Sequence, residues 1–190
     1  VLCGGLSSRL GIEKMSITKE GTPLYLWWKK QFSSMCSEVY ISCNLAQTQK
    51  YSIPNFLIDK VEHQGPLSGL ITAILKNPNS TILMAPVDLC YITTDDINYL
   101  ITNHNQNFDA SVFYNQASEV IYPLFGIFEP TIFSKLIVEF NSPTKSIYSV
   151  LLQSNINILT SDINLNDLNT PEEHLNYLDF LKSQESSQVH

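Results

Sequence analysis

The chain has 190 residues, which fits one ordinary domain with a sizeable core. Hydrophobic residues make up 44% of it and charged residues 15%, which excludes a disordered protein, and no apolar run approaches the roughly 20 residues of a membrane-spanning helix. The formal net charge of −7 argues against the basic surface that nucleic-acid binding needs.

The chain starts with Val1-Leu2, which is typical of the end of a strand. This start has no basic leader, so we expect no secretory signal and a few strand residues upstream of Val1. The cysteines form no CxxC pair and lack zinc-finger spacing, which indicates reduced, mostly buried thiols and a cytoplasmic protein. They are Cys3, Cys36, Cys43 and Cys90.

Short apolar runs alternate with helical patterns along the chain. We predict strands over residues 38–43, 56–59, 81–85, 109–114, 120–128 (broken near Pro123) and 157–160. We predict helices over residues 23–35 (with Thr22 as N-cap), 66–75, 94–103, 130–139, 145–152 and 171–181. This alternation predicts one α/β domain over residues 1–182, with helices on both faces of a mostly parallel sheet and a frayed tail over 183–190.

A glycine-rich loop, residues 3–14, follows the first strand. Glycines let backbone N–H groups approach an oxyanion, and Ser7 and Ser8 add hydroxyl donors. Arg9, the only arginine, offers a planar fork to phosphate oxygens, and Lys14 offers a point charge. A glycine-rich turn alone is more often structural, and this one is neither a Walker A loop nor G-x-G-x-x-G. Its combination with these side chains predicts a triphosphate site.

Other lysines and histidines suggest less. We interpret Lys19, Lys29 and Lys30 as solvated surface residues. His63 lies close to a turn and His104 at a helix end, and both are more often incidental. No Ser-His-Asp or Cys-His arrangement is apparent in the sequence.

Polar residues follow two later strands. Asp88 comes just after a buried strand, where open α/β sheets bind ligands, and a carboxylate there suits Mg²⁺; a helix-capping role is the alternative. Asp59 precedes the segment 65–69, whose glycines indicate either a nucleobase or ribose contact or tight helix–sheet packing. Asp167 and Asn169 belong to a turn and N-cap, or they lie over the cleft.

Five motifs occur in the order seen in one family. They are Gly4-Gly5-x-Ser7-x-Arg9-x-Gly11-x-x-Lys14, Gly21-x-Pro23-Leu24, Gly65-Pro66-Leu67-x-Gly69, Pro86-x-Asp88 and Asn169-Thr170-Pro171. Over nearly its whole length the chain resembles the molybdenum cofactor guanylyltransferases, the MobA family. The resemblance implies a three-layer, Rossmann-like nucleotidyltransferase fold of the GT-A type. Gly4-Gly5 is similar to the guanine-using branch, because cytosine-using relatives tend to have Ala-Gly.

The resemblance also implies a reaction: transfer of GMP from GTP to molybdopterin with Mg²⁺, or Mn²⁺ in its place, and release of pyrophosphate. Arg9, Lys14 and Asp88 would be catalytic, Asp88 would be the metal ligand, and Asp167 and Asn169 would lie on the acceptor side. Because Asp167 stands where the family has an asparagine, we interpret it as a second candidate metal ligand. The implied nucleotide-binding residues are Leu2, Cys3, Gly4, Gly5, Ser7, Ser8, Arg9, Lys14, Asn44, Asp59, Gly65, Pro66, Leu67, Gly69 and Asp88. Contacts with other molybdenum-cofactor biosynthesis proteins and molybdoenzyme apoproteins stay open.

The sequence departs from the family pattern at several positions. Asp167 replaces an asparagine and adds negative charge on the acceptor side; the milder changes are Cys3, Leu10, Glu13 and Val87. Two alternatives remain. One is the same chemistry with CTP, or with another nucleotide and a small phosphorylated acceptor. The other is a nucleotide-binding module without catalysis.

Overall fold

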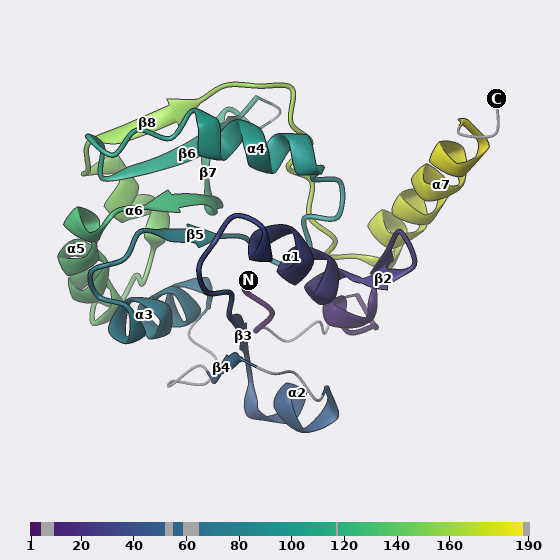
Figure 1. The fold of residues 1–190 in the computed structure, drawn as a ribbon, viewed down its shortest axis with the longest axis horizontal. Coiled ribbons are helices and arrows are strands. Elements are labelled where there is room, and N and C mark those ends of the chain that lie inside the picture. Colours follow the sequence, from purple (N-terminus) through teal and green to yellow (C-terminus); the bar gives the residue numbers. More distant parts are fainter. Residues whose placement is uncertain (5–9, 52–54, 59–64, 117, 188–190) are drawn as a thin grey trace.

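The computed structural model describes residues 1–4, 10–51, 55–58, 65–116 and 118–187 (Figure 1). Four strands form one sheet in the order β5-β7-β6-β8: Ile82–Met84 (β5), Val120–Phe128 (β7), Ala110–Asn115 (β6) and Ile156–Leu159 (β8). Ile41–Cys43 (β3) and Phe56–Ile58 (β4) form a parallel pair.

Residues 1–3 join these two groups of strands into a continuous sheet. The backbone N–H of Leu2 donates to the carbonyl oxygen of Ala85 at 2.8 Å, and that of Cys3 donates to Ser42 at 2.7 Å. Leu2 thereby bridges β3 and the end of β5, parallel to both. The short strand formed by residues 1–3 is therefore central in the sheet. The residues that follow it leave the sheet beside those that follow β5.

The sheet is mixed rather than purely parallel. β7 runs antiparallel to β5 and β6, while the other pairings described in this sheet are parallel. β7 is a single strand, although a break near Pro123 was predicted. Its ladder to β6 jumps from Tyr122 to Gly126, because proline cannot donate a ladder hydrogen bond and the residues between form a bulge.

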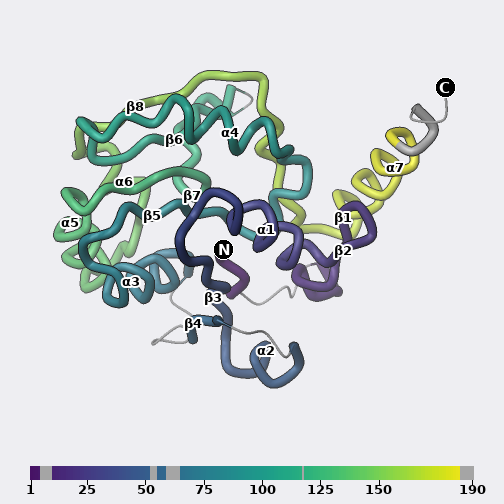
Figure 2. Tube along the Cα trace, in the orientation of Figure 1, coloured from purple at the N-terminus to yellow at the C-terminus, as the bar shows by residue number. Residues whose placement is uncertain are grey.

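Helices cover both faces of the sheet, as predicted. One core cluster contains side chains of Leu24–Ser33 (α1) and Thr94–Thr102 (α4). The other contains side chains of Pro66–Lys76 (α3), Pro130–Phe140 (α5) and Ile147–Leu152 (α6). Leu45–Lys50 (α2) lies beside β4, and Pro171–Ser187 (α7) extends away from the body (Figure 2). The fold is a three-layer α/β arrangement.

Three details differ from the sequence prediction. α1 begins at Leu24, because Thr22–Pro23 (β2) pairs with Thr18–Lys19 (β1) in a hairpin and Pro23 takes the N-cap position. α2 was missed, since six residues are too few for a helical period. α7 continues to Ser187 and so includes residues that were predicted to be frayed.

The cysteines are mostly buried, as predicted. Cys3, Cys43 and Cys90 are buried, and Cys36 is half-buried. Within the described part of the chain, no helix is long and apolar enough to cross a bilayer.

Candidate active site

The candidate site lies at the edge of the sheet where residues 1–3 and β5 end. Several predicted site residues fall outside the described residues, namely Gly5, Ser7, Ser8, Arg9 and Asp59. His63 also falls outside them. The predicted residues that the structure describes can be placed individually.

Lys14 joins two residues that are distant in the sequence. It is the first residue of a 3₁₀ turn, Lys14–Ser16, that follows the glycine-rich loop. Its Nζ forms an ion pair with the carboxylate of Asp88 and donates to Oδ1 of Asn169 at 2.7 Å. The ammonium group of Lys14 therefore joins the end of the glycine-rich loop to the segment that follows β5 and to the segment before α7.

Asp88 is held in a desolvated position. The backbone N–H of Val87, the residue before it, donates to the carbonyl oxygen of Leu2 at 2.9 Å, so the sheet orients it. Asp88 is 9% exposed. Burial raises its pKa, Lys14 partly opposes that shift, and the charge of Asp167 raises the pKa further. Asp167 therefore lies close enough to Asp88 for the two carboxylates to interact.

Asn169 is oriented by the start of α7. The backbone N–H groups of Asn169 and Thr170 donate to Oε2 of Glu173 at 2.7 and 2.8 Å, and the N–H of Glu173 donates to Oγ1 of Thr170 at 3.2 Å. The bond from Asn169 is the main cause that lowers the pKa of Glu173. This is the predicted N-cap, and it also directs the Asn169 amide to Lys14. Asn169 therefore precedes the capping residue Thr170 and also accepts a hydrogen bond from Lys14.

The remaining predicted nucleotide contacts near the first strand fall into two groups. Gly4 is exposed at the end of that strand. Cys3 is buried, and its carbonyl oxygen accepts from Nε2 of Gln47 at 3.1 Å. Asn44 caps α2, because its side chain accepts from the N–H of Gln47. Leu2 pairs within the sheet; it and Asn44 are half-buried, and among these four residues only Gly4 is exposed.

The structure favours a packing role for Gly69, at the end of the 65–69 segment, over a ligand contact. Gly65, at φ 73°, is the N-cap of α3, and Pro66 opens the helix as predicted. Leu67 and Gly69 are both buried. A Cβ on Gly69 would lie 2.4 Å from Oγ of Ser42. The glycine is therefore needed for the close approach of α3 to the sheet.

Comparison with known proteins identifies the family. The family model for the MobA-like NTP transferase domain matches residues 1–154. The chain belongs to this family. The matched region includes both Lys14, at the end of the glycine-rich loop, and Asp88, in the segment that follows β5.

The individual relatives share about a quarter of the aligned residues with this chain. A molybdenum cofactor biosynthesis bifunctional protein of Synechocystis is 26% identical over 178 residues, which cover 92% of this chain and 51% of that protein. The chain thus spans about half the length of this relative. A probable molybdenum cofactor guanylyltransferase of Flavobacterium johnsoniae is 25% identical over 70% of this chain and 68% of that protein.

Solved structures agree on the fold. Molybdopterin-guanine dinucleotide biosynthesis protein A from Archaeoglobus fulgidus superimposes with a TM-score of 0.78 at 17% identity, covering 96% of this chain and 97% of that one. Rv0371c from Mycobacterium tuberculosis gives a TM-score of 0.75 at 16% identity over 94% and 95% of the two chains. The three-layer α/β nucleotidyltransferase fold is therefore established for this chain.

Two residues near the site escaped the sequence analysis. Tyr122 lies on β7 next to the bulge, and its pKa is raised by burial and by the charges of Asp88 and Asp167. An aromatic residue in a strand gives no sequence signal for such a position. Lys19 was predicted to be solvated, but it is 8% exposed, so that prediction is wrong.

His104 belongs to a buried polar cluster away from the site. Its Nδ1 lies 2.8 Å from Oγ of Ser111, and its Nε2 lies 2.7 Å from Oε1 of Glu129. Ser111 is fully buried and cannot meet a substrate. The cluster therefore satisfies polar groups in the interior, and the Ser-His-Glu arrangement is not a nucleophilic site.

The side chains present fit a magnesium ion held partly by substrate. Within the described residues, no three His, Cys, Asp or Glu side chains form a metal cluster. Mg²⁺ is usually bound by one or two carboxylates together with phosphates and water. Asp88 alone meets that requirement, and the charge of Asp167 is close enough to raise the pKa of Asp88.

Proposed function

We propose that the chain transfers GMP from GTP to molybdopterin, with Mg²⁺, and releases pyrophosphate. The observation that carries this proposal is the meeting of Lys14, Asp88 and Asn169, one from each of three separated motifs. The names of the relatives in Synechocystis and Flavobacterium johnsoniae support the molybdenum-cofactor acceptor. We also propose Asp88 and Asp167 as the metal ligands.

The chemistry needs positioning and charge neutralisation rather than a strong base. An oxygen of the acceptor's terminal phosphate forms a bond to the α-phosphorus of GTP. The bond from that phosphorus to the bridging oxygen breaks, and pyrophosphate leaves with the electron pair. The attacking phosphate is already an anion at neutral pH, so proton removal is not the main barrier.

The residues of this chain divide the work. Lys14 neutralises the phosphates, and Arg9 of the glycine-rich loop is proposed to do the same. Asp88 would hold the metal, which supplies further charge neutralisation at the phosphates when it is bound. Asn169 positions Lys14 through the 2.7 Å hydrogen bond. Because Lys14 and Asp88 form an ion pair in the ligand-free protein, that pair would have to separate for Lys14 to contact the phosphates and for Asp88 to hold the metal.

The direct test is pyrophosphate release from each of the four nucleoside triphosphates. Purified molybdopterin is supplied as acceptor, and each reaction is run with Mg²⁺ and with a chelator. Release with GTP alone, requiring both Mg²⁺ and molybdopterin, is the expected result. Release with CTP would replace the guanylyl assignment by a cytidylyl one. Binding of GTP without any release would contradict catalysis.

Tyr122 is expected to act on the acceptor side of this reaction. Burial and the charges of Asp88 and Asp167 raise its pKa, and the hydroxyl, protonated at neutral pH, can donate a hydrogen bond near these carboxylates. Tyr122→Phe should raise the KM for molybdopterin by about tenfold, the cost of one hydrogen bond to a charged group, and leave the Kd for GTP unchanged. Steady-state kinetics and calorimetry measure the two constants.

The matched control is Tyr148→Phe, which removes a hydroxyl from a tyrosine packed against the other core cluster. It should change neither constant. An equal rise of both constants in Tyr122→Phe would contradict an acceptor-side role.

A further inference from the structure

Lys19 is a buried lysine with a complete set of partners. It is 8% exposed, and burial lowers its pKa. Its Nζ donates to the carbonyl oxygens of Cys90, at 2.8 Å, and of Ile92, and it lies 4.3 Å from the ring centre of Trp27. Taking an ammonium group out of water is costly, so a lysine at this depth is unusual.

Both carbonyl groups belong to the loop that follows Asp88. Before Asp88, the loop is tied to the sheet through the N–H of Val87. After it, the N–H of Cys90 donates to the carbonyl oxygen of Asp88 at 2.9 Å, and Lys19 holds the carbonyl groups of Cys90 and Ile92. Asp88 is therefore fixed on one side by the sheet and on the other by Lys19.

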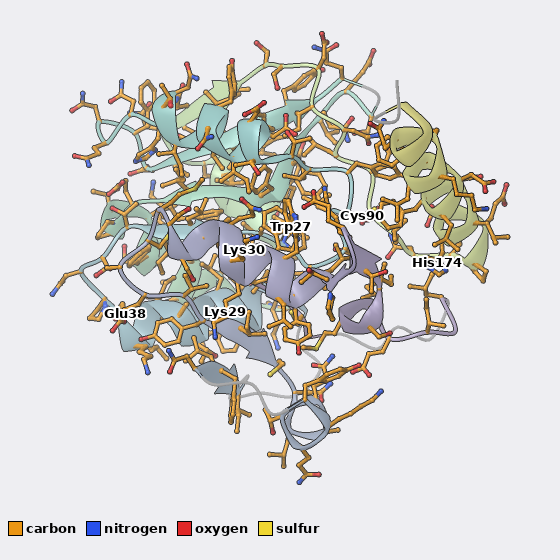
Figure 3. The ribbon with its side chains drawn as sticks, turned by 45° about the vertical axis from the view of Figure 1, so that its right-hand side comes forward. Trp27, Lys29, Lys30, Glu38, Cys90 and His174 are labelled. Atoms are coloured by element: carbon orange, nitrogen blue, oxygen red, sulfur yellow. The ribbon has the colours of Figure 1, made fainter. Side chains whose placement is uncertain are left out.

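The same short segment supplies both lysines that contact this loop. Lys14 contacts the Asp88 carboxylate, and Lys19, five residues later, contacts the backbone. The hydroxyl of Tyr177 on α7 donates to the carbonyl oxygen of Thr18 at 3.2 Å, next to Lys19. Trp27 of α1 and Cys90 lie next to one another in Figure 3. The segment that carries Asn169 is thus attached at the same place.

We propose that Lys19 is a positioning residue that sets the loop carrying Asp88 relative to the segment carrying Lys14. This proposal rests on the proposed function for its catalytic consequence. An apolar residue would leave two carbonyl groups without their donor, so the loop could shift and the carboxylate with it. Substrate binding would separate Lys14 from the Asp88 carboxylate, whereas the hydrogen bonds from Lys19 to the loop would remain.

The test compares Lys19→Met with the wild-type protein in two measurements. The first is amide hydrogen exchange of peptides covering residues 87–93 in the protein without ligands, where Lys19→Met should exchange at least tenfold faster. The second is Mn²⁺ binding in the presence of a non-hydrolysable GTP analogue, followed by electron paramagnetic resonance. Its Kd should rise by about 10- to 100-fold, the usual effect of losing a group that orients a metal ligand. The Kd for the analogue at saturating metal should stay within threefold.

Lys30→Met is the matched control, because it removes the same charge from an exposed position of α1. It should behave as the wild type in both measurements. A Lys19→Met protein with a lower Tm but wild-type exchange at 87–93 and wild-type Mn²⁺ affinity would overturn the proposal, since Lys19 would then only stabilise the fold.

A second variant covers poor folding of Lys19→Met. Lys19→Gln keeps a neutral donor on a shorter side chain, and it should show intermediate exchange and affinity; wild-type values would overturn the proposal. Failure of the proposed function is seen separately, as absence of pyrophosphate release by the wild type. Hydrogen exchange in the ligand-free protein does not depend on that outcome.

Discussion

Asp88→Asn is expected to lower the turnover of GTP by about 10²- to 10³-fold while leaving the fold at least as stable as that of the wild type. The amide keeps the shape of the carboxylate but loses the charge that would hold the metal. Pyrophosphate release at saturating GTP and Mg²⁺ measures the loss. A variant within about tenfold of the wild-type rate would remove Asp88 from the catalytic group.

The stability part follows from the direction of the pKa shift. Burial raises the pKa of Asp88 in spite of Lys14, so the folded protein binds this proton more tightly than the unfolded chain does. The contribution of Asp88 to stability is therefore greatest below its unfolded pKa and falls as pH rises through the raised value. At neutral pH the asparagine removes this cost, and thermal unfolding should show a Tm no lower than that of the wild type. A clear fall in Tm would mean that the ion pair stabilises the fold.

The sequence was most informative where local patterns are strong. The outer bounds of β7 and the start of α3 were predicted to the residue, because an apolar run and a Gly-Pro helix start are local signals, although β7 is one strand and the prediction had broken it near Pro123. The family resemblance implied that Lys14, Asp88 and Asn169 serve one site, but the contacts of Lys14 with the other two side chains come from the structure. All three are spread over the chain, and only the order of strands in the sheet brings them together.

What the sequence missed depends on distant neighbours. Lys19 sits in a polar hairpin typical of the surface, and its burial is caused by Cys90 and Ile92, more than 70 residues later. Gly69 suited either a ligand or packing, and the side chain of Ser42 on β3 decides for packing. Such contacts are set by the tertiary fold, so no periodicity or spacing in the chain could have revealed them.

Lys14→Met is expected to lower turnover as strongly as Asp88→Asn, by about 10²- to 10³-fold, but to destabilise the protein as well. It removes a positive charge from the phosphates, so the Kd for GTP should also rise. It leaves the Asp88 carboxylate buried without its ammonium partner. Losing one member of a fully buried pair costs about 3–5 kcal/mol. The side chain of Lys14 is 22% exposed, so we expect about 1–3 kcal/mol here.

The double variant Lys14→Met/Asp88→Asn separates the two effects. With neither charge present, stability should return to within about 0.5 kcal/mol of the wild type, whereas turnover should stay as low as in either single variant. Urea unfolding and pyrophosphate release measure the two sides of this cycle. If the double variant were as unstable as Lys14→Met alone, Lys14 and Asp88 would not act as a pair in solution. A coupled pair would show that the Lys14 ammonium group offsets the cost of burying the Asp88 carboxylate in the folded protein.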